Sequence, residues 1–388
     1  MSKAPTAIEL FCGCGGMSTG LLDAGIRTAA GFDIDRRSIE AYEYNHAYRG
    51  SRGFVANLTE MTGNLLLRSA RLADVDLLVG GPPCQPFSIV GARRGGDDRR
   101  SDLIAEFLRL VKEMNPRAVL LENVPNLASV DGGKHINRFH AGLLDLGYGV
   151  RMEVVASADY GVPQVRRRLI LLAIKGCSNI RFPGPTHASP MERHGSGLKP
   201  WITSSQVLSD LPPAGDFGEC GVHNHEMTMH TPDMLARFAT LRPGEREKRS
   251  FHDRLHPDKP SFTLRAGSGN FSPLRPIHYA YDRVITARES ARLQGFADTF
   301  IWPDGIPRLQ QYRQVGNAVP PQLAAAMARC IAEQLEWRLE PTECNGDHSK
   351  RANAITLSDL ERQTMRQSRI RGASLGRGAE LLRETASA

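Results

Sequence analysis

Short apolar segments alternate with helical stretches along the first third of the sequence, and this order limits the fold more than any other feature. The segments have the length and branching of buried strands. The predicted strands are 7–11, 28–32, 54–58, 75–79 and 117–124, with a further candidate at 169–174. Helical stretches separate them, chiefly at 36–48, 65–72 and 103–114. The alternation predicts an α/β fold in which helices wrap a parallel sheet.

The composition favours a nucleic-acid partner, but weakly. The chain has 388 residues, a formal net charge of +7 and a pI of about 9.1, which suits a polyanionic partner. Seven cysteines without regular spacing indicate reduced thiols and a cytoplasmic protein. Residues 1–7 lack the apolar core of a secretory signal, and no apolar run reaches membrane-spanning length. We therefore expect no membrane contact.

The fourth predicted strand runs into the turn G-G-P-P-C-Q-P-F-S at residues 80–88. Glycine and proline restrict this turn to few shapes, and Cys84 stands at its tip. Ligands of open α/β sheets bind at the carboxyl ends of the strands, so the position suits a nucleophile. A buried structural cysteine is the alternative, and the local pattern does not choose between the two.

The first predicted strand runs into a second turn, C-G-C-G-G at residues 12–16, which a helix follows. This arrangement is typical of nucleotide-binding units, although the spacing is not G-x-G-x-x-G. Asp33 stands about 20 residues further on, where an acidic side chain suits ribose hydroxyls. A helix-capping aspartate is the alternative. Cys12 and Cys14 lack the second ligand pair of a zinc site.

The amino-acid composition changes at about residue 182 and becomes rich in Pro, Gly, His and Ser. No strand–helix alternation is visible from there to about residue 276. We interpret this stretch as a separate, loop-rich domain. His223, His225 and His230 lie near Cys220, but no second closely spaced ligand pair follows, so polar loop histidines are the better interpretation and no metal is expected. Beyond residue 316 an amphipathic helix is predicted, which would cover part of the sheet. The tail from 340 is polar and Arg-rich and is expected to lack a packed core.

Several blocks in this order resemble the bacterial cytosine-C5 DNA methyltransferases of restriction–modification systems. The blocks are 11–16, Asp33, 81–85, 122–124, 164–168, 288–296 and 316–319. The resemblance implies S-adenosyl-L-methionine as methyl donor and a cytosine flipped out of double-stranded DNA. It also implies a Rossmann-like catalytic and cofactor-binding domain at 1–180, a smaller target-recognition domain at 181–310, a helix at 311–340 that returns to the first domain, and a tail at 341–388.

The resemblance assigns the chemistry to four residues. Cys84 would add to C6 of cytosine, after which C5 accepts the methyl group. Glu122 would contact N3 and the exocyclic amine, and its place after three apolar residues favours a protonated acid. A salt-bridged strand-end carboxylate is the alternative. Arg166 and Arg168 alternate on a predicted strand and so share a face, from which they would approach the cytosine O2 and the catalytic loop, while Arg167 faces away.

The resemblance also assigns the cofactor pocket. Phe11 would pack on the adenine, the glycine turn would cradle the methionine part, and Asp33 would hold the ribose hydroxyls. The full predicted set is Phe11, Gly13, Gly15, Gly16, Asp33, Ile34, Asn57, Leu58, Pro83, Leu103, Asn317 and Ala318. Asn57 stands where the family usually has an aspartate that contacts the adenine amino group. An amide still accepts that hydrogen bond but without charge, so we expect weaker cofactor binding.

DNA contacts are expected from two stretches. By resemblance, 89–101 is a mobile loop that closes over the DNA, with arginines suited to phosphates; a plain surface loop is the alternative. The residues that recognise the DNA sequence are expected between about 186 and 281. The predicted DNA-binding residues are Gln85, Ser88, Arg93, Arg94, Gln164, Arg242, Arg246, Lys248, Arg249 and Arg254.

Two other functions remain possible from the sequence. The tRNA-methylating branch of the family is one, but its Cys-Phe-Thr tripeptide is absent. A DNA-binding regulator without catalysis is the other, and intact Cys84, Glu122 and Arg168 speak against it. The expected enzyme is a monomer that acts on DNA and pairs functionally with a restriction endonuclease. The recognised sequence does not follow from one chain.

Overall fold

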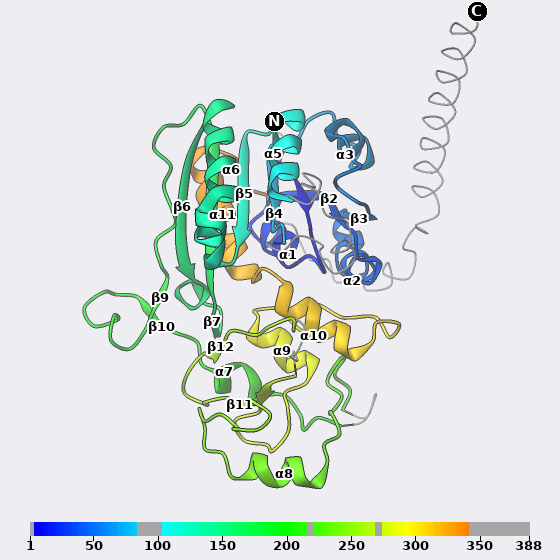
Figure 1. Cartoon of the computed structure of the whole chain (residues 1–388), viewed down its shortest axis with the longest axis vertical. Coiled ribbons are helices and arrows are strands. Elements are labelled where there is room, and N and C mark those ends of the chain that lie inside the picture. The colour runs from blue at the N-terminus through cyan, green and yellow to red at the C-terminus, as the bar shows by residue number, and fades with distance from the viewer. Residues whose placement is uncertain (1–3, 84–102, 216–219, 268–273, 341–388) are drawn as a thin grey trace, which may run out of the picture. The chain divides into compact units, whose positions relative to one another are not determined.

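A seven-stranded sheet is the largest sheet among the described residues (Figure 1). The computed structural model describes residues 4–83, 103–215, 220–267 and 274–340. The strand order is β3-β2-β1-β4-β5-β8-β6. The strands are β1 (Thr6–Leu10), β2 (Arg27–Asp33), β3 (Arg52–Val55), β4 (Leu77–Gly80), β5 (Ala118–Asn123), β6 (Tyr148–Ala156) and β8 (Arg167–Lys175). This confirms the predicted α/β class.

Strands β1 to β5 pair in parallel, whereas β8 pairs antiparallel with both β5 and β6. The sequence did not predict β6. Most of its residues are only partly buried or exposed, because it lies at the edge of the sheet, and a half-exposed edge strand lacks the apolar run that marks a central one. The mixed sheet therefore departs from the all-parallel expectation at one side.

Helices cover both faces of this sheet. They are α1 (Gly16–Asp23), α2 (Arg36–His46), α3 (Gly63–Ser69), α5 (Leu103–Met114), α6 (Lys134–Asp145) and α11 (Pro321–Gln334), with 3-10 turns at Ala47–Arg49, Pro125–Ala128, Val130–Gly133 and Ser157–Tyr160. Leu21 of α1 and Leu323 of α11 are fully buried in one core cluster with residues of β1, β4, β5 and β8. Helices α5 and α6 lie in front of the sheet and α11 behind it (Figure 1). Helix α11, near the end of the described chain, thus packs on the sheet.

Short elements and loops make up the region from about residue 181 to 317 (Figure 1). They are β9 (His187–Ala188) with β10 (Lys199–Pro200), β11 (Asp253–Arg254) with β13 (Pro276–Ile277), α7 (Ser204–Leu208), α8 (Pro232–Ala239), α9 (Ala287–Leu293) and α10 (Arg308–Asn317). A further strand, β12 (Ser261–Phe262), pairs with β7 (Gln164–Val165), which precedes this region. The sequence missed α10. Gly316 and Asn317, expected to open the last helix, close α10 instead.

Buried arginines hold these loops together. Arg288 is fully buried, and its guanidinium donates to the carbonyl oxygens of His223 at 3.1 Å and Phe300 at 2.8 Å. Loops bring carbonyl oxygens inside without strand or helix partners, and a guanidinium carries five donors in a fixed fork. Arginine can therefore replace regular hydrogen bonding where the chain is irregular. In the part of the chain that the structure describes, no helix is long and apolar enough to cross a membrane.

Candidate active site

A cavity of about 740 Å³ opens at the carboxyl ends of β1, β2, β4 and β5. This is where a doubly wound sheet binds its ligand. Most of the residues predicted for catalysis or cofactor binding line it, although they come from distant parts of the sequence. They are Phe11, Gly13, Asp33, Ile34, Asn57, Leu58, Pro83, Leu103, Glu122, Arg166, Arg168, Asn317 and Ala318. Cys84 itself, with Gln85, Ser88, Arg93 and Arg94, lies outside the described residues, but Pro83 directly precedes it.

Gly15 and Gly16 are not among the lining residues of this cavity, contrary to the prediction. Gly15 has φ +91°, and a Cβ there would lie 2.4 Å from Cε1 of His46. A Cβ on Gly16 would lie 2.3 Å from the carbonyl oxygen of Val319. Both glycines therefore permit close packing of α1 against α2 and the start of α11. Of the three predicted glycines, Gly13 alone lines the cavity.

Asp33 joins the end of β2 to the glycine turn. Its Oδ2 accepts from the backbone N–H of Gly13 at 2.8 Å, and its Oδ1 accepts from that of Asp35 at 2.8 Å. Burial raises the pKa of Asp33, against these hydrogen bonds. Asp35, rather than Asp33, caps α2 by accepting from Arg37. Asp33 therefore lines the cavity, and the helix-capping role that was the alternative for Asp33 is filled by Asp35.

Asn57 is already hydrogen-bonded within its own loop. Its Oδ1 accepts from the backbone N–H of Thr59 at 3.2 Å and from the hydroxyl of Thr59 at 3.0 Å. Its Nδ2 donates to Oε1 of Glu60 at 2.8 Å. The amide thus fixes the turn that follows β3. A contact to a ligand would share an oxygen that already accepts two hydrogen bonds, which the sequence could not show.

Arg109 of α5 holds the loop that follows β3, a role that was not predicted from the sequence. Its guanidinium donates to the carbonyl oxygens of Leu58 at 3.1 Å and Met61 at 2.9 Å. Glu106 and Glu113, one turn away on either side, form ion pairs with it at 2.8 and 2.7 Å. The i, i+3 and i+4 spacing of these charges on one helix was the available signal. Arg109 therefore ties the loop after β3 to α5.

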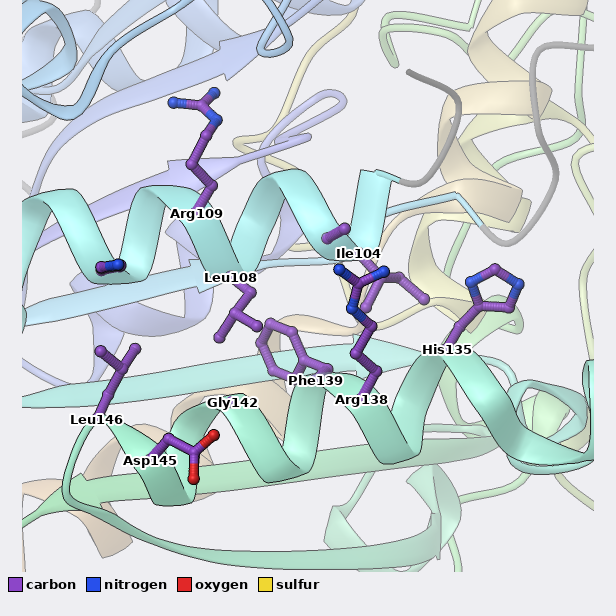
Figure 2. A pocket seen from close by; sticks show the side chains of 11 residues that line it. Ile104, Leu108, Arg109, His135, Arg138, Phe139, Gly142, Asp145 and Leu146 are labelled. Atoms are coloured by element: carbon purple, nitrogen blue, oxygen red, sulfur yellow. The ribbon is translucent and has the colours of Figure 1, made fainter. Parts of the chain in front are cut away.

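A smaller hollow of about 350 Å³ lies between α5 and α6. Figure 2 shows Leu108 and Phe139 facing each other across it, with His135 and Arg138 along α6, while Arg109 points away from Phe139. No residue predicted for catalysis or cofactor binding lines it. This hollow is therefore separate from the candidate active site.

Glu122 and Arg168 form an ion pair inside the cavity. Oε1 of Glu122, at the end of β5, lies 2.7 Å from Nε of Arg168, at the start of β8, and both side chains are about nine-tenths buried. This ion pair is the contact that the salt-bridge alternative predicted. Both residues also line the cavity, as the catalytic interpretation of Glu122 requires. Asn123, the next residue, donates from Nδ2 to the carbonyl oxygen of Pro82 at 2.8 Å. Asn123 thereby holds the proline turn that leads to Cys84, a role not predicted from the sequence.

Arg166 joins three segments at the cavity wall. It is 2% exposed, and its guanidinium donates to the carbonyl oxygens of Leu264 at 2.9 Å and Gly316 at 2.8 Å. Burial lowers the pKa of Arg166 to about 9, and the charge of Arg168 adds to this effect. Arg167 is exposed between them, in agreement with the predicted alternation. Arg166 thus connects the sheet, the loop-rich region and the end of α10.

Two of the predicted DNA-binding residues are buried in the structure, which contradicts a contact to DNA from the surface. Gln164 is fully buried and donates from Nε2 to Oε1 of Gln294 at 2.6 Å. Arg254 is 5% exposed, donates to the carbonyl oxygen of Phe238 at 2.7 Å and pairs with Asp282. A polar residue in a loop-rich stretch has no periodicity that would mark it as buried. The predicted residues Arg242, Arg246, Lys248 and Arg249 are exposed.

Two of the three histidines considered for zinc have other partners. Both ring nitrogens of His225 lie within hydrogen-bond distance, 2.8 Å from the Thr286 hydroxyl and 2.9 Å from the carbonyl oxygen of Pro212. His230 accepts from the backbone N–H of Val284 at 3.2 Å. Across the described ranges, no three His, Cys, Asp or Glu side chains are grouped as metal ligands would be.

The family described as C-5 cytosine-specific DNA methylase matches residues 6–333. The chain belongs to this family. It is 32% identical over 341 residues to the type II methyltransferase M1.HphI of Haemophilus parahaemolyticus, covering 84% of this chain and 86% of that protein. It is 33% identical over 396 residues to the type II methyltransferase M.XorII of Xanthomonas oryzae pv. oryzae, covering 92% and 91%.

Solved structures agree with this assignment. The fold resembles the crystal structure of a protein described as a DNA modification methyltransferase encoded within an E. coli prophage, with a TM-score of 0.69, 26% identity, and coverage of 86% of this chain and 100% of that one. It also resembles the Dnmt2 methyltransferase of S. pombe, with a TM-score of 0.62 at 19% identity over 86% of this chain and 100% of that one, which shows the fold alone. The predicted enzyme class, DNA (cytosine-5-)-methyltransferase, is confirmed by the family.

Proposed function

We propose that this C-5 cytosine-specific DNA methylase transfers a methyl group from S-adenosyl-L-methionine to a cytosine flipped out of a specific double-stranded DNA sequence. The observation that carries the proposal is the single cavity lined by both predicted sets of residues. Phe11, Asp33 and Asn57 line it from the carboxyl ends of β1, β2 and β3, and Glu122 and Arg168 from β5 and β8. Cofactor and base would therefore meet in one space.

The residues of the wall fit this cofactor. Phe11 offers an aromatic ring, and Asp33 faces the cavity with carboxylate oxygens that hydrogen-bond hydroxyls well. Leu58, Leu103 and Pro83 supply apolar wall between these polar groups. When bound, S-adenosyl-L-methionine supplies an activated methyl group that C5 of cytosine accepts.

The chain's own residues would prepare the base. The thiolate of Cys84 forms a bond to C6, which makes C5 nucleophilic, and the carboxyl group of Glu122 gives its proton to N3 and takes it back when the ring is restored. Arg168 fixes the orientation of Glu122 through their ion pair. After methylation, loss of the C5 proton and departure of the Cys84 sulfur restore the aromatic ring. Arg166 holds the cavity wall through the carbonyl oxygens of Leu264 and Gly316.

We propose further that the enzyme protects DNA from a paired restriction endonuclease, since the two similar proteins named above are type II methyltransferases. Recognition of the DNA target sequence is assigned to the loop-rich stretch between about 186 and 281. Of its residues, Arg242, Lys248 and Arg249 are exposed and have the charge that phosphates and guanines attract.

Covalent trapping tests the proposed chemistry. Bisulfite sequencing of plasmid DNA from cells that express the protein first identifies the methylated sequence. Duplexes with 5-fluorocytosine at that position should then form a denaturant-resistant adduct in the presence of the cofactor, because fluorine does not leave as a proton does. Cys84→Ala should bind the same duplex without forming the adduct. An adduct with Cys84→Ala, or none with the wild type, would overturn the assignment of the nucleophile.

A further inference from the structure

A short antiparallel hairpin carries two of the exposed basic residues of the loop-rich region. The backbone N–H of Glu247 donates to the carbonyl oxygen of His252 at 2.8 Å. One step closer to the base, Arg246 and Asp253 pair through the backbone and also through an ion pair at 2.6 Å. These contacts close a two-stranded ribbon whose tip consists of residues 248–251.

A buried carboxylate holds this tip from inside. Glu247 is 6% exposed, and its Oε2 accepts from the backbone N–H of Arg249 at 3.0 Å and from both the backbone N–H and the hydroxyl of Ser250. Behind the tip, Nδ1 of His252 lies 2.7 Å from the Ser250 hydroxyl, and the ring of His252 packs against that of the buried Phe238, with centroids 5.0 Å apart. The tip is therefore held in one shape without any ligand.

Phe251 occupies an unusual position in this tip. Its side chain is 50% exposed, and its φ is +58°, in the left-handed region that favours glycine. Its backbone N–H donates to the carbonyl oxygen of Glu247 at 3.0 Å, which keeps the residue in this conformation. A bulky residue at such a φ costs stability, and residues of this kind concentrate at functional sites. The exposed ring therefore indicates a contact outside the fold.

The neighbours of Phe251 in the tip are cationic. Lys248 and Arg249 are exposed, and neither forms an ion pair within the part of the chain that the structure describes. On the other side, the guanidinium of Arg275 lies 6.0 Å from the centre of the Phe251 ring. Cations in such positions suit DNA phosphates. The tip thus combines a surface for a polyanion with one apolar ring.

The width of the hairpin favours the major groove of DNA. That groove is about 12 Å wide and admits a two-stranded ribbon, whereas the minor groove is about 6 Å wide. The base edges in the major groove present hydrogen-bond donors and acceptors, and their apolar group is the C5 methyl of thymine. The side chain of Phe251 has neither donor nor acceptor, so the methyl group is the one that its ring can bind.

We propose that Phe251 recognises a thymine in the target DNA sequence by contacting the C5 methyl group of that base. This inference rests on the proposed methylation of a specific double-stranded DNA sequence, and it requires that this sequence contain a thymine. Glu247 acts as a positioning residue, because it does not reach the DNA but fixes the backbone that carries Phe251.

Uracil in place of thymine tests the contact, because it lacks the methyl group and keeps the hydrogen-bonding groups. Bisulfite sequencing first identifies the target, and duplexes then carry deoxyuridine at each thymine of the target in turn. Fluorescence anisotropy measures their binding to the full chain. At one thymine the wild type should lose about 3- to 10-fold in affinity, the range expected for burying one methyl group. Phe251→Ala should bind the thymine duplex more weakly and lose nothing further with uracil at that position.

Further variants separate recognition from folding. Phe251→Gly should fold, because glycine adopts a φ of +58° without strain, yet it should not discriminate thymine from uracil. Phe251→Leu keeps an apolar contact and should retain part of the discrimination, and Glu247→Ala should reduce it because the tip loosens. Leu144→Ala is the matched control, since it truncates an apolar side chain of the same 50% exposure on α6 and should discriminate as the wild type does.

The outcomes separate this inference from the function on which it rests. A target without thymine would overturn the inference, and so would a wild type that binds every uracil duplex as tightly as the thymine duplex. An equal loss with uracil in the wild type and in Phe251→Ala would assign the methyl group to another residue and also overturn it. If the wild type neither methylates nor binds any DNA sequence specifically, the proposed function itself is wrong, and the inference falls with it.

Discussion

Oε1 of Glu122 and Nε of Arg168 lie 2.7 Å apart across the antiparallel strands β5 and β8. Strand pairing brings Glu122 opposite Ile170, two residues beyond Arg168, so the contact depends on the antiparallel direction of β8. A parallel strand at this position would present its opposite end. The antiparallel part of the sheet, which the sequence did not predict in full, therefore creates the pair at the centre of the site.

Replacement of Arg168 should separate catalysis from the surface charge around it. Arg168→Ala leaves Glu122 buried without its partner, and we expect methyl transfer to fall by about 100-fold or more, with a loss of about 3–5 kcal/mol in unfolding free energy. Arg167→Ala, its exposed neighbour, should leave both unchanged. Single-turnover methylation and thermal unfolding measure the two effects. Equal behaviour of the two variants would contradict the role given to the ion pair.

Gly316 should be intolerant of any side chain. A Cβ there would lie 2.4 Å from the backbone nitrogen of Ala266 and the carbonyl carbon of Arg265. These are backbone atoms, so the loop itself would have to move away from Arg166, which also binds the carbonyl oxygen of Gly316. We expect Gly316→Ala to cost about 1–3 kcal/mol of stability, measured by denaturant unfolding.

Gly305 provides the control for this test. A Cβ at Gly305 meets no atom within 4 Å, so Gly305→Ala should leave the free energy of unfolding nearly unchanged. A Gly316→Ala variant as stable as Gly305→Ala would mean that the backbone of residues 265 and 266 moves away at little cost. The contacts around Arg166 would then not be tightly packed.

The sequence predicted those features that repeat along the chain or belong to ordered motifs. Apolar runs marked the strands β1, β2, β4 and β5, and Phe11, Asp33 and Glu122 stand at the carboxyl ends of three of them. The sequence could not distinguish Arg254 from Arg249, because burial in a loop region follows from carbonyl groups that only the folded chain brings together. It also could not show that Gly15 faces His46 rather than the cavity, since both functions require glycine.

Asn57→Asp alone should not tighten cofactor binding, although the family usually has aspartate there. Nδ2 of Asn57 donates to Oε1 of Glu60 at 2.8 Å, and an aspartate would place two carboxylates in that contact. Repulsion would then offset the charged acceptor gained. Asn57→Asp combined with Glu60→Gln restores a donor, and this double variant should bind S-adenosylhomocysteine several-fold more tightly than the wild type, from a gain of about 1 kcal/mol.

Calorimetry on the wild type, both single variants and the double variant measures the coupling. Glu60→Gln alone is the control and should bind as the wild type does. Tighter binding by Asn57→Asp alone would show that Glu60 moves away without cost. No gain in the double variant would show that Asn57 does not face the adenine.

The arginines of the loop-rich region should fall into two classes that the sequence does not separate. Arg254 is buried, donates to the carbonyl oxygen of Phe238 and pairs with Asp282, so Arg254→Ala leaves buried acceptors without donors. We expect a loss of about 3–5 kcal/mol in unfolding free energy, seen in thermal melts. Arg249 is exposed, so Arg249→Ala should leave stability within about 0.5 kcal/mol.

In DNA binding the two variants should differ in the opposite sense: Arg249→Ala should change the binding, and Arg254→Ala should not. If Arg249 contacts a phosphate, Arg249→Ala weakens all sequences alike and reduces the slope of log affinity against log salt by about 1; if it contacts a base edge, specificity relaxes at one position at a cost of about 1–3 kcal/mol. Arg254→Ala, measured well below its melting temperature, should keep the wild-type salt slope because its guanidinium does not reach the surface. Fluorescence anisotropy over a range of salt concentrations, followed by bisulfite sequencing of methylated DNA, reads both effects. A reduced salt slope for Arg254→Ala with unchanged stability would show that the buried arginine turns outward to DNA, against the hydrogen bonds that hold it here.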